Sequence, residues 1–208
     1  MSKRKTILYL LLLFSPICLS SCVTVGIENA KYKVTVKEGK FEIRQYSPQI
    51  VAETVVDAEF DKAGNIAFRR LFDYISGNNH KKESISMTAP VNQKARSEKI
   101  SMTAPVNQYQ SEGRFIVSFV MPSKYTMESL PEPLDSNVVL REVQSCKLAA
   151  VRYSGTWSKK KYEAQKKLLE EFIRNKSLRI TGEAIFARYD PPFQLSFLRR
   201  NEVLIPVE

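Results

Sequence analysis

The sequence predicts an α+β domain with pseudo-two-fold symmetry, made of two units that each contain two strands, a helix and further strands. Three observations favour this fold class: a composition typical of one folded domain, a regular succession of alternating and helical segments, and a similarity between the two halves of the chain. With 208 residues, of which 43% are hydrophobic and 26% charged, one core is large enough to be stable without disulfides or a structural metal.

The first unit opens with two strands and a helix. Residues 41–46 (FEIRQY) alternate between apolar and polar, a Ser-Pro turn follows, and residues 50–56 alternate again. From Asp61 to Ser76 the apolar residues recur every three or four positions, which predicts an amphipathic helix packed on a sheet. We expect Asp61 to cap the start of this helix and Gly77 to end it.

The second helix follows Ser158, whose hydroxyl is suited to cap it. Its apolar stripe comprises Tyr162, Leu168, Leu169, Phe172 and Ile173. Five lysines (159–161, 166 and 167) lack interleaved aromatics or a nucleic-acid-binding motif, so we interpret them as a solvated face and expect no nucleic-acid partner. Further strands are expected at residues 85–93, 100–109 and 115–121 in the first half and at 183–189 and 202–207 in the second.

Two internal repeats are present. An ungapped shift of 97 positions places Ile43 opposite Leu140 and Phe60 opposite Trp157, which duplication of one unit explains most simply. A shorter repeat copies residues 85–93 (ISMTAPVNQ) word for word at residues 100–108. The short repeat is either a hairpin-like extension, a Met-Thr-Ala-Pro lip on a pocket, or recent copying without added chemistry.

The N-terminus resembles a bacterial lipoprotein signal. Residues 3–5 (KRK) are positive, residues 7–17 (ILYLLLLFSPI) are an apolar run too short to span a bilayer, and residues 19–22 (LSSC) match a lipobox whose cysteine receives diacylglycerol. We therefore expect a signal peptide at residues 1–21, lipidated Cys22 with a tether at 22–39, and the folded domain at 40–208, held on a membrane of the bacterial envelope. Tyr32 to Val36 could form an edge strand within the tether. The alternative is an ordinary signal peptide with an incidental cysteine.

The net charge and the small number of cysteines and histidines restrict the possible partners and metal sites. Lys and Arg number 32 against 22 Asp and Glu, a formal net charge of +10, which favours an anionic partner. Three cysteines and one histidine exclude most zinc sites. Cys146 begins an apolar stretch, so we expect it to be a small buried residue of the core.

Five motifs, in this order along the chain, resemble those of the SOUL haem-binding protein family. They are EIRQY at 42–46, YISGNN at 74–79, the ISMTAPV strand, FVMPS at 119–123, and YDPP at 189–192 with RRNEV at 199–203. The resemblance covers roughly residues 40–208. It implies a distorted β-barrel of two pseudo-repeats flanked by two helices, similar to the gyrase-inhibitor-like effector-binding domains. It also implies reversible, non-covalent binding of haem or a related tetrapyrrole without catalysis, and we expect the protein to be a monomer.

The resemblance places a ligand pocket along the first helix and the loop before RRNEV. The residues there that suit a flat apolar ring with two propionates are Phe68, Phe72, Tyr189, Phe193, Phe197, Arg199 and Arg200. Met87 and Met102 are candidate axial ligands of the iron. Core packing is the alternative for the helix aromatics and the methionines, and a strand-end role is the alternative for the arginines. Gln45 stands where one branch of the family carries a histidine, and His80 falls in a polar loop.

Three other functions stay open at this point. The protein could bind another small apolar anion, or it could be an envelope adaptor that binds a protein partner through the basic helix face. It could also be a small-molecule hydrolase that uses Glu183 as a general base, if that carboxylate is buried. The sequence contains no nucleophile elbow, Walker loop or zinc-protease motif, so we expect no enzymatic activity.

Overall fold

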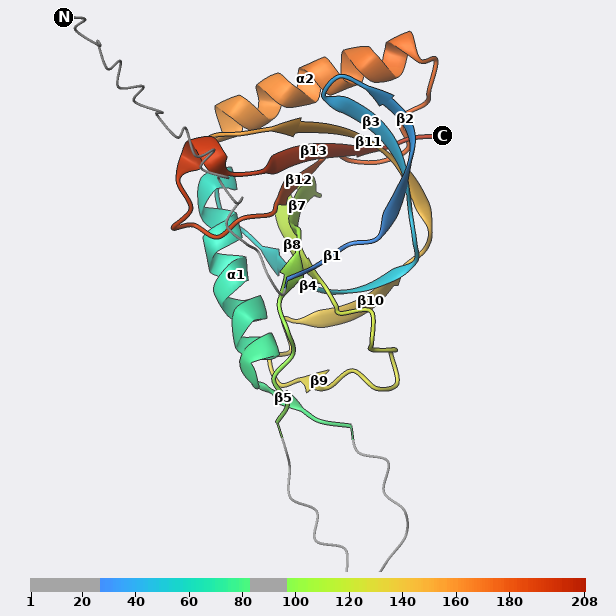
Figure 1. Cartoon of the computed structure of the whole chain (residues 1–208). Coiled ribbons are helices and arrows are strands. Elements are labelled where there is room, and N and C mark those ends of the chain that lie inside the picture. Colours follow the sequence, from blue (N-terminus) through green and yellow to red (C-terminus); the bar gives the residue numbers. More distant parts are fainter. Residues whose placement is uncertain (1–26, 83–96) are drawn as a thin grey trace, which may run out of the picture.

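A curled, antiparallel sheet of nine strands forms the body of the molecule, with two long helices on its outside (Figure 1). The computed structural model describes residues 27–82 and 97–208. In chain order the elements are β1 (Glu28–Asn29), β2 (Tyr32–Glu38), β3 (Phe41–Tyr46), β4 (Gln49–Val56), α1 (Phe60–Ser76), β5 (Asn79–His80), β6 (Thr103–Ala104), β7 (Val106–Ser111), β8 (Arg114–Val120), β9 (Glu132–Pro133), β10 (Val139–Val143), β11 (Cys146–Tyr153), α2 (Lys159–Asn175), β12 (Ile185–Arg188), the 3-10 helix η1 (Ser196–Leu198) and β13 (Asn201–Pro206). The predicted α+β fold with two flanking helices is confirmed, and the distorted barrel expected from the resemblance is a curled half-barrel.

The order of the strands confirms the pseudo-two-fold symmetry. The sheet runs β10-β4-β8-β7-β12-β13-β11-β3-β2. The antiparallel pair β7 and β12 lies at the centre of the eight strands from β10 to β3. Outward from this pair β8 matches β13, β4 matches β11, and β10 matches β3, while the edge strand β2 has no counterpart in this sheet. Strands β4 and β11 both have eight residues, and they start 97 positions apart, at Gln49 and Cys146. The shift of 97 positions found in the sequence therefore relates equivalent strands in the two halves of the sheet.

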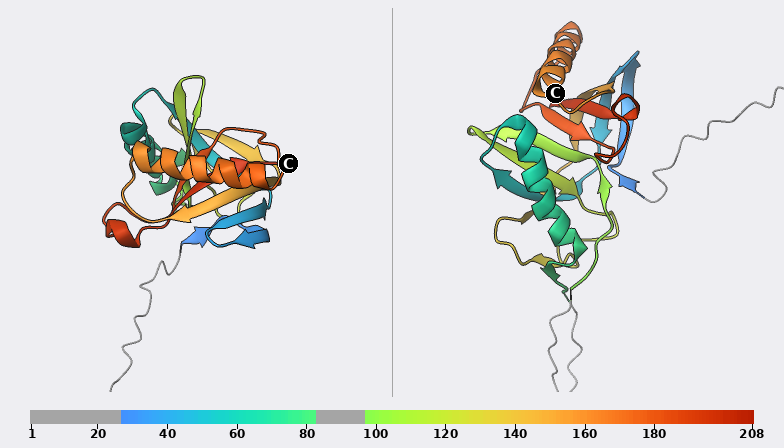
Figure 2. Two further views of the ribbon diagram at one scale, coloured as in Figure 1. Left: turned by 90° about the horizontal axis from the view of Figure 1, so that it is seen from above. Right: turned by 90° about the vertical axis from the view of Figure 1, so that its left-hand side faces the viewer.

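Each helix covers its own half of the sheet (Figure 2). Helix α1 packs on β4 and β8, and α2 packs on β11 and β13. Phe60, at the start of α1, joins the two halves, since its ring lies 5.8 Å from that of Phe115, 5.1 Å from Tyr162 and 5.6 Å from Phe186. On the inner face of the sheet a third apolar cluster includes Tyr46, Leu148 and Leu204.

The helix ends agree in part with the predictions. Ser158 caps α2 as expected, because its hydroxyl accepts a hydrogen bond from the backbone N of Lys161 at 3.4 Å. Gly77 ends α1 with a φ of 122°, a conformation that only glycine adopts readily. The prediction for Asp61 is wrong: the N-cap is Glu59, which makes no side-chain cap bond. Asp61 instead lies in the first turn, where its carboxylate still interacts favourably with the helix dipole.

The sheet begins before Lys40, where we expected the folded domain to start. Strand β2 pairs with β3 along its whole length, which confirms the edge strand expected at Tyr32 to Val36 and extends it to Glu38. Its side chains are almost all exposed, so the sequence carries no pattern of a buried face there. The signal peptide and Cys22 lie outside the described residues.

The second copy of the short repeat lies within the fold and is not a protruding extension. Ile100 is 5% exposed, and Thr103, Ala104 and Val106 are also buried. Its chain forms β6 and then β7, on either side of Pro105. The first copy, with the strand expected at residues 85–93 and Met87, lies outside the described residues, so the hairpin interpretation stays a prediction for that copy.

A buried network of charged groups joins β3 to β13 across β11. The carboxylate of Glu202, 0% exposed, accepts two hydrogen bonds from the Arg44 guanidinium, at 2.6 and 3.1 Å. It also accepts one from Nε of Arg200 at 3.0 Å and one from the Tyr189 hydroxyl at 2.9 Å. Arg44 further donates to the Tyr46 hydroxyl at 3.2 Å. Two arginines thus share one carboxylate, which makes their burial tolerable.

Within residues 27–82 and 97–208, neither helix is long and apolar enough to cross a membrane.

Replacing Glu202 by Gln is expected to lower the free energy of unfolding by about 3–5 kcal/mol, because it removes the buried carboxylate shared by Arg44 and the half-buried Arg200. Of the ion pairs within the described chain, Arg44 then keeps only the one with Glu42. Urea unfolding at pH 7 measures this. The matched control is Glu59→Gln, whose carboxylate forms an exposed ion pair with Lys62 and is expected to change stability little. Equal stability of the two variants would contradict the assigned role of Glu202.

Stability is expected to fall as the pH rises from about 10 to 12. Burial raises the pKa of Tyr46 to about 12 and also raises the pKa of Tyr74 and Tyr162. The fold therefore holds these phenols neutral, whereas the unfolded chain releases their protons near pH 10, so unfolding becomes easier above that pH. Thermal unfolding across this range should show a falling midpoint in the wild type and a shallower fall in Tyr162→Phe. A midpoint constant up to pH 12 would contradict the assignment.

Candidate functional site

A mostly apolar cavity of about 410 Å³ lies between the first half of α1, the strand β6 and the loop that follows β12. Figure 1 shows this loop beside α1. The walls include Phe68, Met102, Val106, Trp157, Arg188 and Tyr189. This volume is within the range of small-molecule sites in proteins.

The aromatic walls come from three parts of the chain. Phe68 projects from α1 and packs edge-on against Phe119, with ring centroids 5.3 Å apart. Trp157, just before α2, donates from its indole nitrogen to the side-chain oxygen of Asn201 at 2.8 Å, which fixes the orientation of the ring. Tyr189 also lines the cavity, although it packs in the apolar cluster on the inner face of the sheet, where its hydroxyl belongs to the Glu202 network.

Arg188 is the only strongly polar group that β12 places in this wall. Its side chain lies on the same face of the strand as Phe186, toward the helices, because residues two apart in a strand share a face. It is 8% exposed, and among the described residues its Nε and Nη2 atoms have no hydrogen-bond partner. Burial lowers the pKa of the guanidinium to about 10. An unpaired buried charge of this kind costs several kcal/mol of stability.

Gly64 of α1 makes room for this guanidinium. A Cβ atom at position 64 would lie 2.5 Å from Nη1 and 2.6 Å from Nη2 of Arg188, which is closer than atoms can approach. The helix backbone itself therefore forms the wall against which the guanidinium lies. The Trp157 ring lies on another side, with its centroid 5.2 Å from the guanidinium carbon.

Within the described chain, only some of the ring-contacting residues and axial ligands predicted from the sequence line the cavity. Phe68, Tyr189 and Met102 line the cavity. Phe72 is 45% exposed and stacks on Phe68 outside the wall, and the loop residues Phe193 and Phe197 are 85% and 67% exposed.

Both predicted arginines are occupied by other contacts. Arg199 donates to the backbone carbonyls of Gln194 and Pro192 and lies over the Trp157 ring, 4.5 Å from its centroid. Arg200 donates to Glu202 and to the Tyr32 hydroxyl. Arg199 thus holds the loop in place and Arg200 belongs to the buried network, which leaves Arg188 as the buried cation without a partner among the described residues of this site.

Sequence reasoning missed Arg188 and did not place Trp157 in the site. Arg188 follows three apolar residues in a strand, at an inward position that alternation from Phe186 would have identified. A charged residue at such a position needs a partner. Trp157 was visible only as the counterpart of Phe60 in the repeat.

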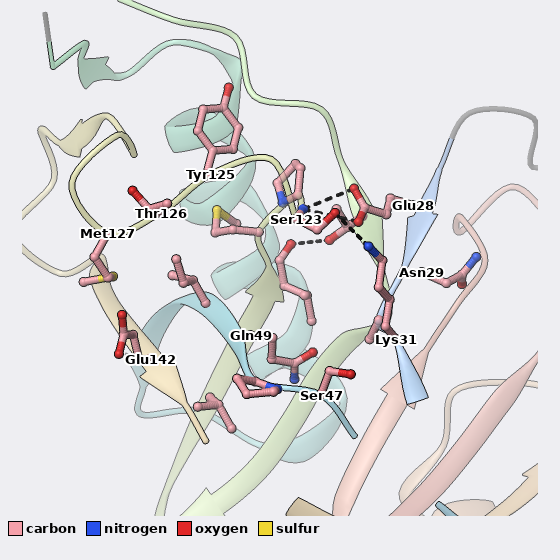
Figure 3. A pocket seen from close by; sticks show the side chains of 18 of the residues that line it. Glu28, Asn29, Lys31, Ser47, Gln49, Ser123, Tyr125, Thr126, Met127 and Glu142 are labelled. Carbon is pink, nitrogen blue, oxygen red and sulfur yellow. Dashed lines mark hydrogen bonds between the residues drawn. The ribbon is translucent and has the colours of Figure 1, made fainter. Parts of the chain in front are cut away.

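A second cavity, of about 380 Å³, lies between β1, the start of β4 and the segment that follows β8 (Figure 3). Two of its charged groups are partnered: Glu28 accepts hydrogen bonds from the backbone N of Ser123 at 3.2 and 3.3 Å, and Lys31 donates to the Ser123 hydroxyl at 3.1 Å. A third, Glu142, is exposed to solvent. The side-chain oxygen of Gln49 lacks a partner among the described residues, but a neutral amide costs less to bury than a charge. This cavity is therefore the weaker candidate.

A third cavity, of about 310 Å³, includes Glu183 and Cys146. Glu183 is exposed, so the burial that would make it a general base is missing. Cys146 is half-buried instead of buried as we expected, and this partial burial raises the pKa of its thiol. It ends up half-exposed because β11 starts at this residue, beside the cavity.

Metal ligands are scarce around the main cavity. Across the described part of the chain, no group of three or more His, Cys, Asp or Glu side chains could hold a metal ion. His80 is exposed and lies in β5, beyond the C-terminal end of α1, whereas the cavity contacts the first half of that helix. The Met102 thioether is the sulfur donor that the described lining offers.

Known proteins share the sequence pattern and the fold of this chain. The model of the family described as SOUL heme-binding protein matches residues 27–206. The chain is 30% identical over 168 residues to heme-binding protein 2 of Mus musculus, covering 79% of this chain and 77% of that one. It is 26% identical over 188 residues to heme-binding protein 1 of Xenopus tropicalis, covering 86% and 91%. Among solved structures, the EcmrR C-terminal domain shares the fold, with a TM-score of 0.56 and 11% identity over 85% of this chain and 98% of that one. An apolar cavity between α1 and the loop before β13, on a half-barrel of two related units, is thus found in a chain that belongs to the SOUL heme-binding protein family.

Proposed function

We propose that the cavity beside α1 binds haem or a related tetrapyrrole reversibly and non-covalently, and that the protein catalyses no reaction. The observation that carries this proposal is an apolar cavity with aromatic walls that also contains an unpaired cation, Arg188. A tetrapyrrole combines a flat apolar ring with carboxylates, so it is complementary to both features. Membership of the family supports the same ligand class.

The residues present fit the organic part of haem better than its iron. Phe68 and Trp157 can contact the ring, and Arg188 can pair with a propionate. Bound haem would supply a redox-active iron, for which Met102 is the candidate protein ligand in the described wall and Met87 stays a candidate outside it. The contribution of this chain is therefore to bind and orient the ring and to exclude water from it.

We also propose that Cys22 carries a lipid anchor that holds the domain on a membrane of the bacterial envelope. The support is the sequence of residues 1–22, with its positive start, short apolar run and lipobox. The domain would then hold its ligand at the membrane surface. Two acyl chains on one cysteine are enough for stable anchoring.

Titration of the purified protein with haemin should saturate near one equivalent with a micromolar or lower Kd. Soret absorbance and quenching of Trp157, the one tryptophan of the chain, report binding directly because this ring lines the cavity. Phe68→Ala should weaken binding by about 10-fold or more through the loss of apolar contact, whereas Phe193→Ala, exposed outside the cavity wall, should not. Non-saturating uptake by the wild type would contradict the proposal.

Replacement of Cys22 by Ser should move the protein from the membrane fraction to the periplasmic or medium fraction and abolish incorporation of labelled palmitate. Cys18→Ser is the matched control, since Pro16 and Ile17 before it do not form a lipobox. Unchanged membrane association of the Cys22 variant would contradict the anchor.

A further inference from the structure

Arg188 is the buried arginine of the cavity wall, and within residues 27–82 and 97–208 its Nε and Nη2 atoms have no hydrogen-bond partner. Arg69, the other arginine of the lining, is exposed to solvent. Arg44 and Arg200 share the Glu202 carboxylate, and Arg199 donates to two backbone carbonyls. Among the described residues, no carboxylate forms an ion pair with Arg188, and two of its nitrogens make no hydrogen bond. Since buried charges in folded proteins are normally paired, this one points to a partner that is not part of the described chain.

The surroundings of Arg188 stabilise the cation only in part. The rings of Trp157 and Phe186 lie 5.2 and 5.8 Å from its guanidinium carbon, within the range of cation–π attraction. Asp190 also lines the cavity, but its carboxylate accepts a hydrogen bond from the backbone N of Arg200. Stacking on a ring leaves the N–H donors of a guanidinium in its own plane free, so their preferred partner is still a planar acceptor such as a carboxylate.

Gly64 shows that the local structure accommodates the cation. The close approach of α1 to the guanidinium requires a residue without a Cβ, although glycine inside a helix is unfavourable. The rest of the wall is mostly apolar, and its other polar residues are Asn65, Arg69, Thr103 and Asp190. Because Arg69 is exposed, an anion that enters this cavity would meet Arg188 as the buried cation of the described wall, where an ionic interaction is stronger than at the surface.

We propose that Arg188 pairs with a carboxylate of the bound ligand, so that the cavity selects carboxylate-bearing apolar molecules over uncharged molecules of the same shape. This inference rests on the proposed use of the cavity as a binding site, but it does not require that the ligand be haem or contain iron. A tetrapyrrole propionate and a fatty-acid carboxylate are two sources of the same chemistry.

Calorimetric titration tests the selectivity in the wild type without any substitution. Protoporphyrin IX is compared with its dimethyl ester, and dodecanoate with methyl dodecanoate. The free acid of at least one pair should bind about 30-fold or more tightly than its ester, the effect typical of losing one partner of a buried charge pair. Equal binding of acid and ester in both pairs, or no binding of either acid, would overturn the proposal.

Arg188→Met then assigns the selectivity to this side chain. It should abolish the preference for acid over ester, while Arg188→Lys should keep part of it. Arg114→Met, in the exposed β7–β8 hairpin, is the matched control and should bind as the wild type does. A preference that persists in Arg188→Met would overturn the proposal.

The ligand-free protein provides an independent measurement. Methionine replaces the aliphatic part of arginine and has no charge, so Arg188→Met should raise the thermal midpoint, by a few degrees or more. Arg114→Met should not. A lower midpoint, or failure to fold, would mean that the guanidinium already has a stabilising partner and would overturn the proposal.

The two pairs of ligands, protoporphyrin and dodecanoate with their esters, distinguish failure of this inference from failure of the proposed function. If dodecanoate binds in an Arg188-dependent way and no tetrapyrrole does, the tetrapyrrole proposal fails and the role of Arg188 holds. If tetrapyrroles bind with equal affinity as acid and ester, the tetrapyrrole proposal holds and the role of Arg188 fails.

Discussion

The carboxylate of Glu202 is the group on which the geometry of the site depends. It accepts hydrogen bonds from Arg44 of β3, from Arg200 and from Tyr189, so it fixes both ends of the loop between β12 and β13. Tyr189 and the start of that loop form one wall of the cavity. Because the carboxylate is fully buried, moving either arginine away would remove part of the counter-charge that makes its burial tolerable. The network therefore keeps the cavity wall in one conformation.

This network also explains the motifs that mark the family in this chain. Arg44 comes from EIRQY, Tyr189 from YDPP, and Arg200 and Glu202 from RRNEV. EIRQY is far from the other two segments in the sequence, and it meets RRNEV because β3 and β13 pair with opposite edges of β11. The motif residues in this network are thus structural, and Arg188, whose Nε and Nη2 atoms have no partner among the described residues, lies just before YDPP.

Much of the fold followed from local patterns. Burial of one face imposes a period on the sequence. For this reason the sequence predicted the amphipathic helices α1 and α2, the alternating strands β3 and β4, and the repeat at a shift of 97 positions. The edge strand β2 was only partly readable, since both of its faces are exposed. Phe72 fits the apolar stripe of α1 yet is 45% exposed, because a helical pattern identifies a face but not the edge of what covers it.

By itself, the sequence determined the fold class and the duplicated architecture, because these depend on patterns repeated over many residues, and its five motifs identified the family. The tertiary structure decided which charged groups already have partners within the described chain. Arg199 and Arg200 were the expected contacts of the anion. In the structure Arg199 donates to the backbone carbonyls of Gln194 and Pro192, and Arg200 donates to Glu202 and to the distant Tyr32 hydroxyl. Arg188 is unpaired because no carboxylate of the described chain reaches it. Pairing of charges depends on three-dimensional proximity, and no local pattern in the sequence encodes it.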